Sequence, residues 1–155
     1  MISLIVAVDK KGCIGFNGKM PWNIPEEMKH FREYTWGKSV LVGKNTFEGF
    51  KKPLENRFHY ILSSKEFKGD NIEVVSDLNK LIEKFKNSDD ELVVIGGAKV
   101  YNYFLEIVDK MVISVIQDEF EGDTYFPPFD LSNFNLISKK DHTKFIVYTF
   151  VREEI

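Results

Sequence analysis

The stretch that decides how this chain folds is Gly15-Phe16-Asn17-Gly18-Lys19-Met20-Pro21-Trp22-Asn23-Ile24-Pro25-Glu26-Glu27-Met28. It begins as a loop hinged by two glycines, continues through Pro-Trp and enters a helix. Proline suits the first turn of a helix because its missing N–H would be unpaired there in any case. We therefore predict a helix that begins near Pro25 and runs to about Trp36, where Gly37 follows as a C-cap.

The predicted helix carries an acid where a core residue belongs. Helical spacing places one mostly apolar stripe on a single face: Ile24, Met28, Phe31 and Thr35. Glu27 lies on that stripe, whereas Glu26 lies on the opposite side, where water reaches it. An ionised carboxylate is costly to bury unless it is paired or hydrogen-bonded, and burial raises its pKa. Two interpretations of Glu27 stay open: an N-terminal acid stabilised by the helix dipole, and a functional acid.

The composition is that of one globular domain. The chain has 155 residues, 43% apolar and 29% charged, and we expect a single domain over residues 1–155. A formal charge of −3 without a basic block does not favour nucleic acid, and no apolar run is long enough for a membrane span. The sequence starts directly in a strand pattern, without a signal peptide, and its one cysteine, Cys13, fits a reducing compartment. We expect a cytoplasmic protein.

Short apolar runs alternate with helical patterns along the chain. The predicted strands cover residues 2–8, 39–43, 58–62, 73–75, 92–95, 110–117, 134–139 and 145–151. Besides the helix from Pro25, helices are predicted to begin at residue 44, to follow Asp77 as N-cap, and to span residues 98–107. Residues 12–23 are interpreted as a lid-like loop and residues 121–124 as a loop. This alternation predicts an α/β fold with a largely parallel central sheet, and the last two strands form an antiparallel edge because no helix separates them.

Three predicted strand ends carry residues suited to a bound ligand. In open α/β sheets, ligands bind beyond the carboxyl ends of the strands. The three segments are Gly43-Lys44-Asn45-Thr46, Ser63-Ser64-Lys65 and Gly96-Gly97-Ala98-Lys99, which offer glycines, hydroxyls and cations. Each alone is also typical of ordinary capping, and neither the Gly-x-Gly-x-x-Gly fingerprint nor a Walker A loop is present.

Few other residues point to chemistry from their spacing alone. Arg57 can offer its planar fork to a ligand carboxylate or form a surface ion pair, and both interpretations stay open. His30, His59, His142 and Cys13 show no metal-ligand spacing, so no metal site is expected. No serine nucleophile with a paired base is visible.

Taken together, these residues resemble the dihydrofolate reductase family over essentially the whole chain. The resemblance is carried by these segments: Ile14-Gly15; Met20 to Pro25 with Glu27; Gly43 with Thr46-Phe47-Glu48; Lys52-Pro53-Leu54 with Arg57; Leu62-Ser63-Ser64; Ile95-Gly96-Gly97 with Tyr101; and Glu121-Gly122-Asp123-Thr124. The Pro-Trp-x-x-Pro-x-acid element is highly specific. The resemblance implies an eight-stranded sheet with about four helices, and NADPH-dependent reduction of 7,8-dihydrofolate to 5,6,7,8-tetrahydrofolate, a reaction that supports one-carbon, thymidylate and purine metabolism.

The resemblance also implies roles for residues around the substrate. Four would take part in catalysis: Glu27, Trp22, Ser114 and Tyr101. Glu27 would bind the amino group and ring N–H of the pterin and favour protonation at N5 while hydride passes to C6. The rest of the substrate site would comprise the backbone of Ile5 and Val6, with Ile95, Met28, Phe31, Phe50, Leu54 and Ser114. Arg57 would bind the α-carboxylate of the glutamate tail.

For NADPH, the resemblance implies a nicotinamide half held by Ala7, Ile14, Gly15, Gly18 and Met20. The remainder of the cofactor would contact Gly43, Lys44, Asn45, Thr46, Leu62, Ser63, Ser64, Lys65, Ile95, Gly96, Gly97, Ala98, Lys99, Val100 and Tyr101. Within this set Lys44, Ser64 and Lys65 would contact the 2′-phosphate. We also expect a cis peptide at Gly96–Gly97, and a latch at Asp123 that holds the lid loop through its backbone.

Four positions depart from the commonest bacterial pattern of the family. Glu27 replaces aspartate, Ser114 replaces threonine, Lys44 replaces arginine and Gly49 replaces serine. The methylene added at Glu27 shifts the carboxylate, and Ser114 keeps the hydroxyl. Lys44 carries a compact ammonium charge in place of the planar guanidinium of arginine. None of these changes removes an essential function.

Two rival functions are weighed against this one. A fold relative that reduces a ribosylated pyrimidine in riboflavin synthesis should lack the helix acid and the tail-binding arginine, and both are present here. A catalytically inactive nucleotide- or folate-binding module is disfavoured by Glu27, Trp22 and the glycine-hinged lid. The expected partners are dihydrofolate and antifolate inhibitors, without nucleic acid or membrane, and the expected state is a monomer.

Overall fold

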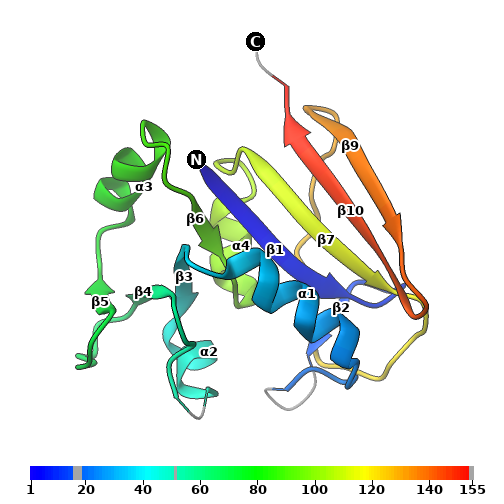
Figure 1. The fold of residues 1–155 in the computed structure, drawn as a ribbon, viewed down its shortest axis with the longest axis horizontal. Coiled ribbons are helices and arrows are strands. Elements are labelled where there is room, and N and C mark those ends of the chain that lie inside the picture. The colour runs from blue at the N-terminus through cyan, green and yellow to red at the C-terminus, as the bar shows by residue number, and fades with distance from the viewer. Residues whose placement is uncertain (16–18, 51, 154–155) are drawn as a thin grey trace.

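The structure is a computed structural model that describes residues 1–15, 19–50 and 52–153. Its strands are β1 (Ile2–Val8), β2 (Cys13–Gly15), β3 (Ser39–Gly43), β4 (Phe58–Leu62), β5 (Ile72–Val75), β6 (Leu92–Val94), β7 (Lys110–Ile116), β8 (Thr124–Tyr125), β9 (Phe134–Asp141) and β10 (Phe145–Arg152). Its helices are α1 (Pro25–Thr35), α2 (Lys44–Glu48), α3 (Leu78–Lys86) and α4 (Ala98–Phe104) (Figure 1). The predicted α/β class is confirmed.

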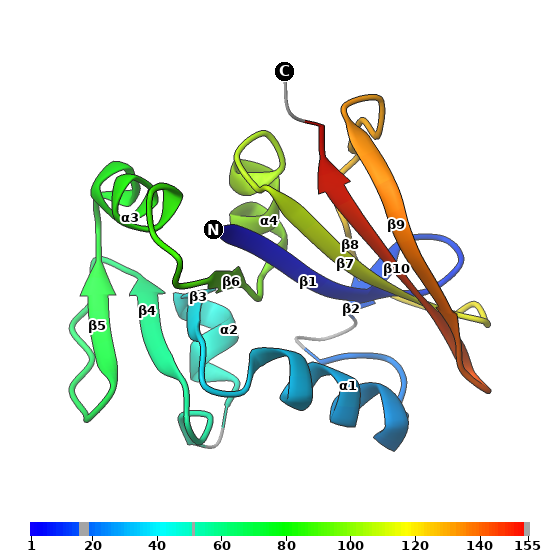
Figure 2. The same cartoon turned by 45° about the horizontal axis from the view of Figure 1, so that its top comes forward.

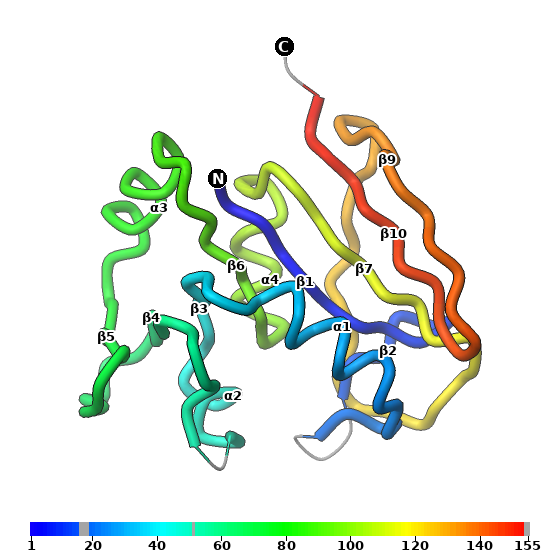
Figure 3. The backbone as a smooth tube through the Cα atoms, viewed as in Figure 1, coloured from blue at the N-terminus to red at the C-terminus, as the bar shows by residue number. Residues whose placement is uncertain are grey.

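Eight strands form the central sheet in the order β5-β4-β3-β6-β1-β7-β10-β9. All neighbours from β5 to β7 pair in parallel, and β10 runs antiparallel to both β7 and β9. Figure 3 follows the backbone from β1, near the centre of the sheet, to β9 at its edge. The predicted antiparallel C-terminal edge is therefore confirmed, and the carboxyl ends of β4, β3, β6, β1 and β7 lie along one edge of the sheet.

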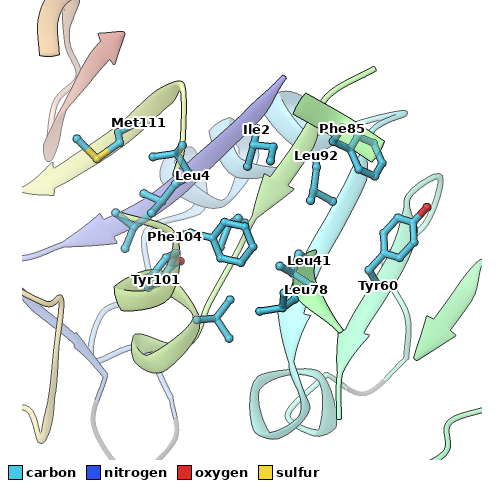
Figure 4. Packing of buried hydrophobic residues seen from close by; sticks show 14 of the residues in the cluster. Ile2, Leu4, Leu41, Tyr60, Leu78, Phe85, Leu92, Tyr101, Phe104 and Met111 are labelled. Atoms are coloured by element: carbon cyan, nitrogen blue, oxygen red, sulfur yellow. The ribbon is translucent and has the colours of Figure 1, made fainter. Parts of the chain in front are cut away.

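The two faces of the sheet carry two apolar clusters. Side chains alternate along β1, so Leu4 and Val6 join one cluster while Ile5 joins the other. The first cluster takes in α3 and α4, and its centre includes the fully buried Phe104 (Figure 4). The second takes in Trp22 and the sheet-facing side of α1, which Figure 2 shows on the other side of the sheet from α3 and α4. No helix in the described ranges is long and apolar enough to cross a membrane.

Most predicted elements match the structure closely. β1, β3 and β4 have the predicted bounds, α1 begins at Pro25, and Asp77 caps α3 by accepting a hydrogen bond from the Asn79 N–H at 3.0 Å. Helix α4 is shorter than predicted, because the chain turns after Phe104. The Ile107 and Val108 N–H groups both donate to the Phe104 carbonyl, and this tight turn buries Val108 before β7 begins.

Two short strands were interpreted as loops from the sequence. β2 and β8 form a separate antiparallel pair in which Cys13 faces Tyr125 and Gly15 faces Thr124. Strands of three and two residues are too short to show a period of their own. The lid segment therefore starts with a strand that is paired to the loop before β9.

Buried Asp9 joins the end of β1 to both of these segments. One carboxylate oxygen accepts the Lys11 and Cys13 N–H groups at 2.8 and 2.9 Å, and the other accepts the Phe120 N–H at 2.8 Å. A carboxylate satisfied by three backbone donors makes charge-assisted bonds, which are stronger than neutral ones. Asp9 therefore anchors the lid segment and the 118–126 loop to the sheet.

Replacing Asp9 is expected to destabilise the fold far more than replacing a surface cap. Asp9→Ala leaves three backbone N–H groups without their acceptor, so we expect a loss of about 3 kcal/mol in the free energy of unfolding. Asp77→Ala is the matched control, with an expected loss of about 1 kcal/mol. Urea unfolding measures both, and equal losses would contradict the anchoring role of Asp9.

Candidate active site

The shared edge of the parallel strands brings two of the predicted ligand segments together. β3 ends at Gly43 and β6 ends just before Ile95. The Gly43 N–H donates to the Gly96 carbonyl at 2.8 Å, which joins the start of α2 to the start of α4. The expected cis peptide is present at Gly96–Gly97.

Both glycines at this junction are tightly packed at the position where a side chain would begin. A Cβ on Gly43 would lie 3.2 Å from the Val100 side chain, and one on Gly97 would lie 3.1 Å from the Thr46 hydroxyl. Gly43 and Gly97 are also the N-caps of α2 and α4, and neither supplies a side-chain acceptor to the first turn. The junction thus presents backbone N–H groups and the Thr46 hydroxyl, and a side chain at either glycine would require a neighbour to shift by a few tenths of an ångström.

The other residues predicted to contact the cofactor lie around this junction. Lys44 forms an i,i+4 pair with Glu48 at 3.8 Å on the surface of α2, and the Ser63 hydroxyl accepts the Lys65 N–H at 2.9 Å beyond the end of β4. Ser64 and Asn45 are exposed. The remaining members lie at the end of β4, directly after β6 and along α4: Leu62, Ile95, Ala98, Lys99, Val100 and Tyr101.

Glu27 lies in the first turn of α1 with its side chain buried, 5% exposed. Burial raises the pKa of its carboxyl to about 7. Burial, together with the negative charge of Glu27, also raises the pKa of Tyr101, whose hydroxyl donates to the Ile5 carbonyl at 2.8 Å. Glu26 is exposed on the other side of the helix and contacts His142 at 2.8 Å, so the predicted division between the two acids is confirmed.

Two polar atoms on this face of the sheet are buried without a hydrogen-bond partner in the described chain: Trp22 Nε1 and Ser114 Oγ. Ser114 lies on β7 opposite Ala7 of β1. It is two residues after Val112 on the same strand, so both side chains lie on the face of the second apolar cluster. Buried polar groups are rarely left unpaired, so these two mark a place where a ligand or water belongs. The Trp22 ring packs on Phe120 at 5.5 Å between centroids, a contact that no sequence period indicated.

The apolar residues predicted to hold the substrate border the same cluster. Phe31, Phe50 and Leu54 are partly buried against it, and Ile5 and Ile95 belong to it. Ala7, which is predicted to contact the nicotinamide half of the cofactor, is also partly buried there. The side chain of Val6 faces the opposite cluster, which leaves only its backbone on this side. Met28 was predicted on the buried stripe of α1 but is 46% exposed, because no described element covers it.

Arg57 is held in place at the other end of α1. Its Nε donates to the Thr35 hydroxyl at 3.1 Å, one terminal nitrogen donates to the Arg32 carbonyl at 2.6 Å, and the other to the Glu55 carbonyl. The side chain is buried, and burial together with the charge of Arg32 lowers its pKa. Among the described residues no carboxylate forms an ion pair with it, so the surface ion-pair interpretation is wrong.

The lid segment and its predicted latch are in contact through their backbones. The Asp123 N–H donates to the Gly15 carbonyl at 3.0 Å, and its carboxylate accepts the Thr124 hydroxyl at 2.9 Å. Ile14 is half-buried and Met20 is exposed at the other end of the segment, while Gly18 lies outside the described residues. A Cβ on Gly122 would lie 2.0 Å from Cys13 Sγ, so the two segments touch where only glycine fits.

Comparisons with known proteins match this chain over nearly its full length. The family model described as dihydrofolate reductase matches residues 1–154. Dihydrofolate reductase of Bacillus subtilis (strain 168) is 37% identical over 93% of this chain and 86% of its own, and that of Lactococcus lactis subsp. lactis is 36% identical over 93% and 89%. The solved structure of dihydrofolate reductase from Enterococcus faecalis, complexed with NADP(H) and RAB-propyl, superposes with a TM-score of 0.89 at 28% identity, covering 99% of this chain and 97% of that one.

These matches define the class of protein as an NADPH-dependent oxidoreductase built on an eight-stranded α/β sheet. The chain belongs to the dihydrofolate reductase family. The family assignment confirms the resemblance found in the sequence.

A side chain at position 122 is expected to disturb the contact between the lid segment and its latch. The added methyl of Gly122→Ala overlaps Cys13 Sγ and lies 2.7 Å from the Gly15 carbonyl, so we expect a loss of about 1–3 kcal/mol in stability and slower NADPH oxidation. Adding Cys13→Ala removes the sulfur and is expected to restore part of the lost stability and part of the lost rate. The restoration is partial because the overlap with the Gly15 carbonyl remains. Thermal unfolding and steady-state rates are measured for the two single variants and the double variant. If Cys13→Ala restored neither quantity in the double variant, the predicted overlap with the sulfur would be contradicted.

Proposed function

We propose that this chain reduces 7,8-dihydrofolate to 5,6,7,8-tetrahydrofolate with Glu27 as the acid of its pterin site. The observation that carries the proposal is a buried carboxyl, whose pKa is raised to about 7, on the face of the sheet that also holds the unpaired Trp22 Nε1 and Ser114 Oγ. A buried carboxyl and two unpaired polar atoms beside an apolar cluster fit a flat heterocycle that is rich in nitrogen. The apolar residues of that cluster fit its ring faces.

Glu27 would bind the edge of the pterin. A carboxylate accepts hydrogen bonds from an amino group and a neighbouring ring N–H at the same time, which fixes the ring in one orientation. The Ile5 carbonyl already accepts the Tyr101 hydroxyl and retains a second lone pair toward the ring. The Ser114 hydroxyl would donate to the Glu27 carboxylate or to a water beside it, which would satisfy an otherwise unpaired group.

Glu27 would also hold the proton that the reaction requires. Reduction at C6 leaves N5 to be protonated, and a carboxyl whose pKa lies near 7 keeps a proton available at neutral pH. The apolar cluster around the carboxyl excludes bulk water, and this exclusion is what raises the pKa. Glu27 would therefore act as a proton reservoir for N5, with Trp22 Nε1 and Ser114 Oγ as contacts for any water that relays the proton.

The junction of α2 and α4 fits the cofactor. Gly43 and Gly97 carry no side chain, so a phosphate would approach the neighbouring backbone N–H groups closely, and the Thr46 hydroxyl lies beside Gly97. When bound, NADPH supplies the hydride that goes to C6. Backbone N–H groups at the starts of α2 and α4 would hold the pyrophosphate, and the cations and hydroxyls beyond β3 and β4 would hold the 2′-phosphate: Lys44, Ser64 and Lys65. Ala7, Ile14 and Met20 would contact the nicotinamide half.

Arg57 would bind the α-carboxylate of the glutamate tail. Its contacts to Thr35, Arg32 and Glu55 take three of its five N–H groups and leave one on each terminal nitrogen. Two parallel N–H groups match the two oxygens of a carboxylate. The neighbouring Arg32 adds positive charge at the same place.

The enzyme we propose works on small molecules as a single chain. Every side chain of the proposed site comes from one copy of the sequence, so none is missing without a partner subunit. Antifolate inhibitors that mimic the pterin would compete at Glu27. A free, buried Cys13 supports a reducing compartment such as the cytoplasm.

The test of the proposed reaction is NADPH oxidation by the purified chain with 7,8-dihydrofolate as substrate. Oxidation that depends on dihydrofolate and is inhibited by antifolates is expected. Oxidation with a ribosylated aminopyrimidine alone would favour the rival reductase, and tight folate binding without turnover would favour the inactive binding module.

The pH dependence of this reaction should report Glu27. Because the carboxyl titrates near pH 7, kcat/KM for dihydrofolate is expected to fall about tenfold per pH unit above that value. Glu27→Gln cannot supply the proton, so we expect a rate about 10²-fold lower at pH 7 and no titration near pH 7. Glu26→Gln is the matched control at the neighbouring exposed acid and should retain the wild-type profile. An unchanged profile in Glu27→Gln would contradict the assignment.

The same titration should appear in the stability of the protein without ligands. The pKa of Glu27 rises from 4.5 to about 7 on folding, so the folded chain binds the proton more tightly than the unfolded chain. Proton binding by Glu27 therefore adds to the free energy of unfolding. The added stability is fully present below pH 4.5 and is lost as the pH rises to about 7, an expected decrease of about 3 kcal/mol. Urea unfolding across this range measures it as the difference between wild type and Glu27→Gln. A difference that does not change with pH would show that Glu27 is not buried in solution.

A further inference from the structure

An exposed tryptophan covers the arginine that would bind the substrate tail. Trp36 follows the last turn of α1 and is 57% exposed. Its ring lies over the guanidinium of Arg57, with the central carbon 4.9 Å from the ring centroid. This exposed ring therefore makes a cation–π contact with a buried cation.

The two kinds of contact to Arg57 do not compete. Thr35, Arg32 and Glu55 accept hydrogen bonds from the guanidinium N–H groups, and these bonds lie in the plane of the group. Trp36 uses none of these N–H groups, because its contact is a cation–π contact in which the central carbon of the guanidinium lies over the ring. The in-plane N–H groups that remain can therefore bind a carboxylate while the ring stays in place.

We infer that Trp36 is a positioning residue that orients Arg57 for the α-carboxylate of a folate and so favours substrates with a glutamate tail. The inference rests on the proposed function, because it takes Arg57 to be the tail-binding residue. The hydrogen bonds from three sides fix the position of the guanidinium, and the ring restricts its tilt and keeps water from one face. A guanidinium held in this way loses less freedom when it binds a carboxylate.

The affinity that Trp36 contributes should be specific to tailed ligands. A cation–π contact at a partly exposed site changes affinity about two- to tenfold. We therefore expect Trp36→Leu to raise the KM and Kd for 7,8-dihydrofolate about two- to tenfold. It should leave kcat, the Kd for NADPH and the KM for 6-methyl-7,8-dihydropterin unchanged, because that pterin has no tail to reach Arg57.

A double-mutant cycle separates positioning from a merely structural role. Arg57→Leu should weaken dihydrofolate binding with far less effect on NADPH, and adding Trp36→Leu to it should have no further effect. Trp36→Phe keeps an aromatic face and should retain most of the wild-type affinity. Tyr103→Leu removes an aromatic side chain of similar exposure, 48%, from α4 and serves as the matched control.

Two outcomes would overturn the inference. One is an equal rise in KM for the tailed and the tail-less substrate. The other is full additivity of Trp36→Leu and Arg57→Leu. If the wild-type chain oxidised NADPH with neither substrate, the proposed reaction would fail, whereas calorimetric titration with dihydrofolate would still decide the role of Trp36.

Discussion

The burial of one carboxyl group governs the rest of the site. Glu27 lies in the first turn of α1, on the side that packs against the sheet, where water cannot solvate its charge. Within the described residues no cation or hydrogen-bond donor compensates it, so its pKa rises toward neutrality. An uncompensated buried carboxyl is typical of a functional site, where the ligand supplies the missing hydrogen-bond partners. The unpaired Trp22 Nε1 and Ser114 Oγ on the same face support that interpretation, because buried polar groups are rarely left without a hydrogen bond.

A second constraint, the parallel direction of six strands, gathers the residues that we propose for the cofactor at one edge of the sheet. The carboxyl ends of these strands meet at one edge, and there the Gly43 N–H bonds the Gly96 carbonyl. Tyr101 links the two halves of the site, since its helix begins at that glycine junction and its hydroxyl bonds the Ile5 carbonyl of β1. The junction proposed to hold the pyrophosphate is thus joined to the central strand β1 through the side chain of Tyr101.

Local patterns were sufficient to predict the strands, the start of α1 and the acid on its buried face. The bounds of β1 and β3 follow from short apolar runs, and Pro25 marks the helix start. Contacts between distant segments left no local signal. β2 exists only because β8 pairs with it, and the bonds from Asp9 to Phe120 and from Arg57 to Arg32 join segments whose own sequences resemble ordinary turns. Met28 was misplaced because helical spacing gives a direction but does not show whether anything covers it.

Helix α1 sets the separation between the two ends of the substrate site. Glu27 lies in its first turn, whereas Thr35, which bonds Arg57, is its last residue. Eight residues of helix rise about 12 Å. A rigid helix thus fixes how far the acid that would bind the pterin lies from the arginine that would bind the tail. Adding or removing one residue would rotate one end by about 100° relative to the other, so the stacking of Trp36 on Arg57 and the burial of Glu27 depend on the same helix length.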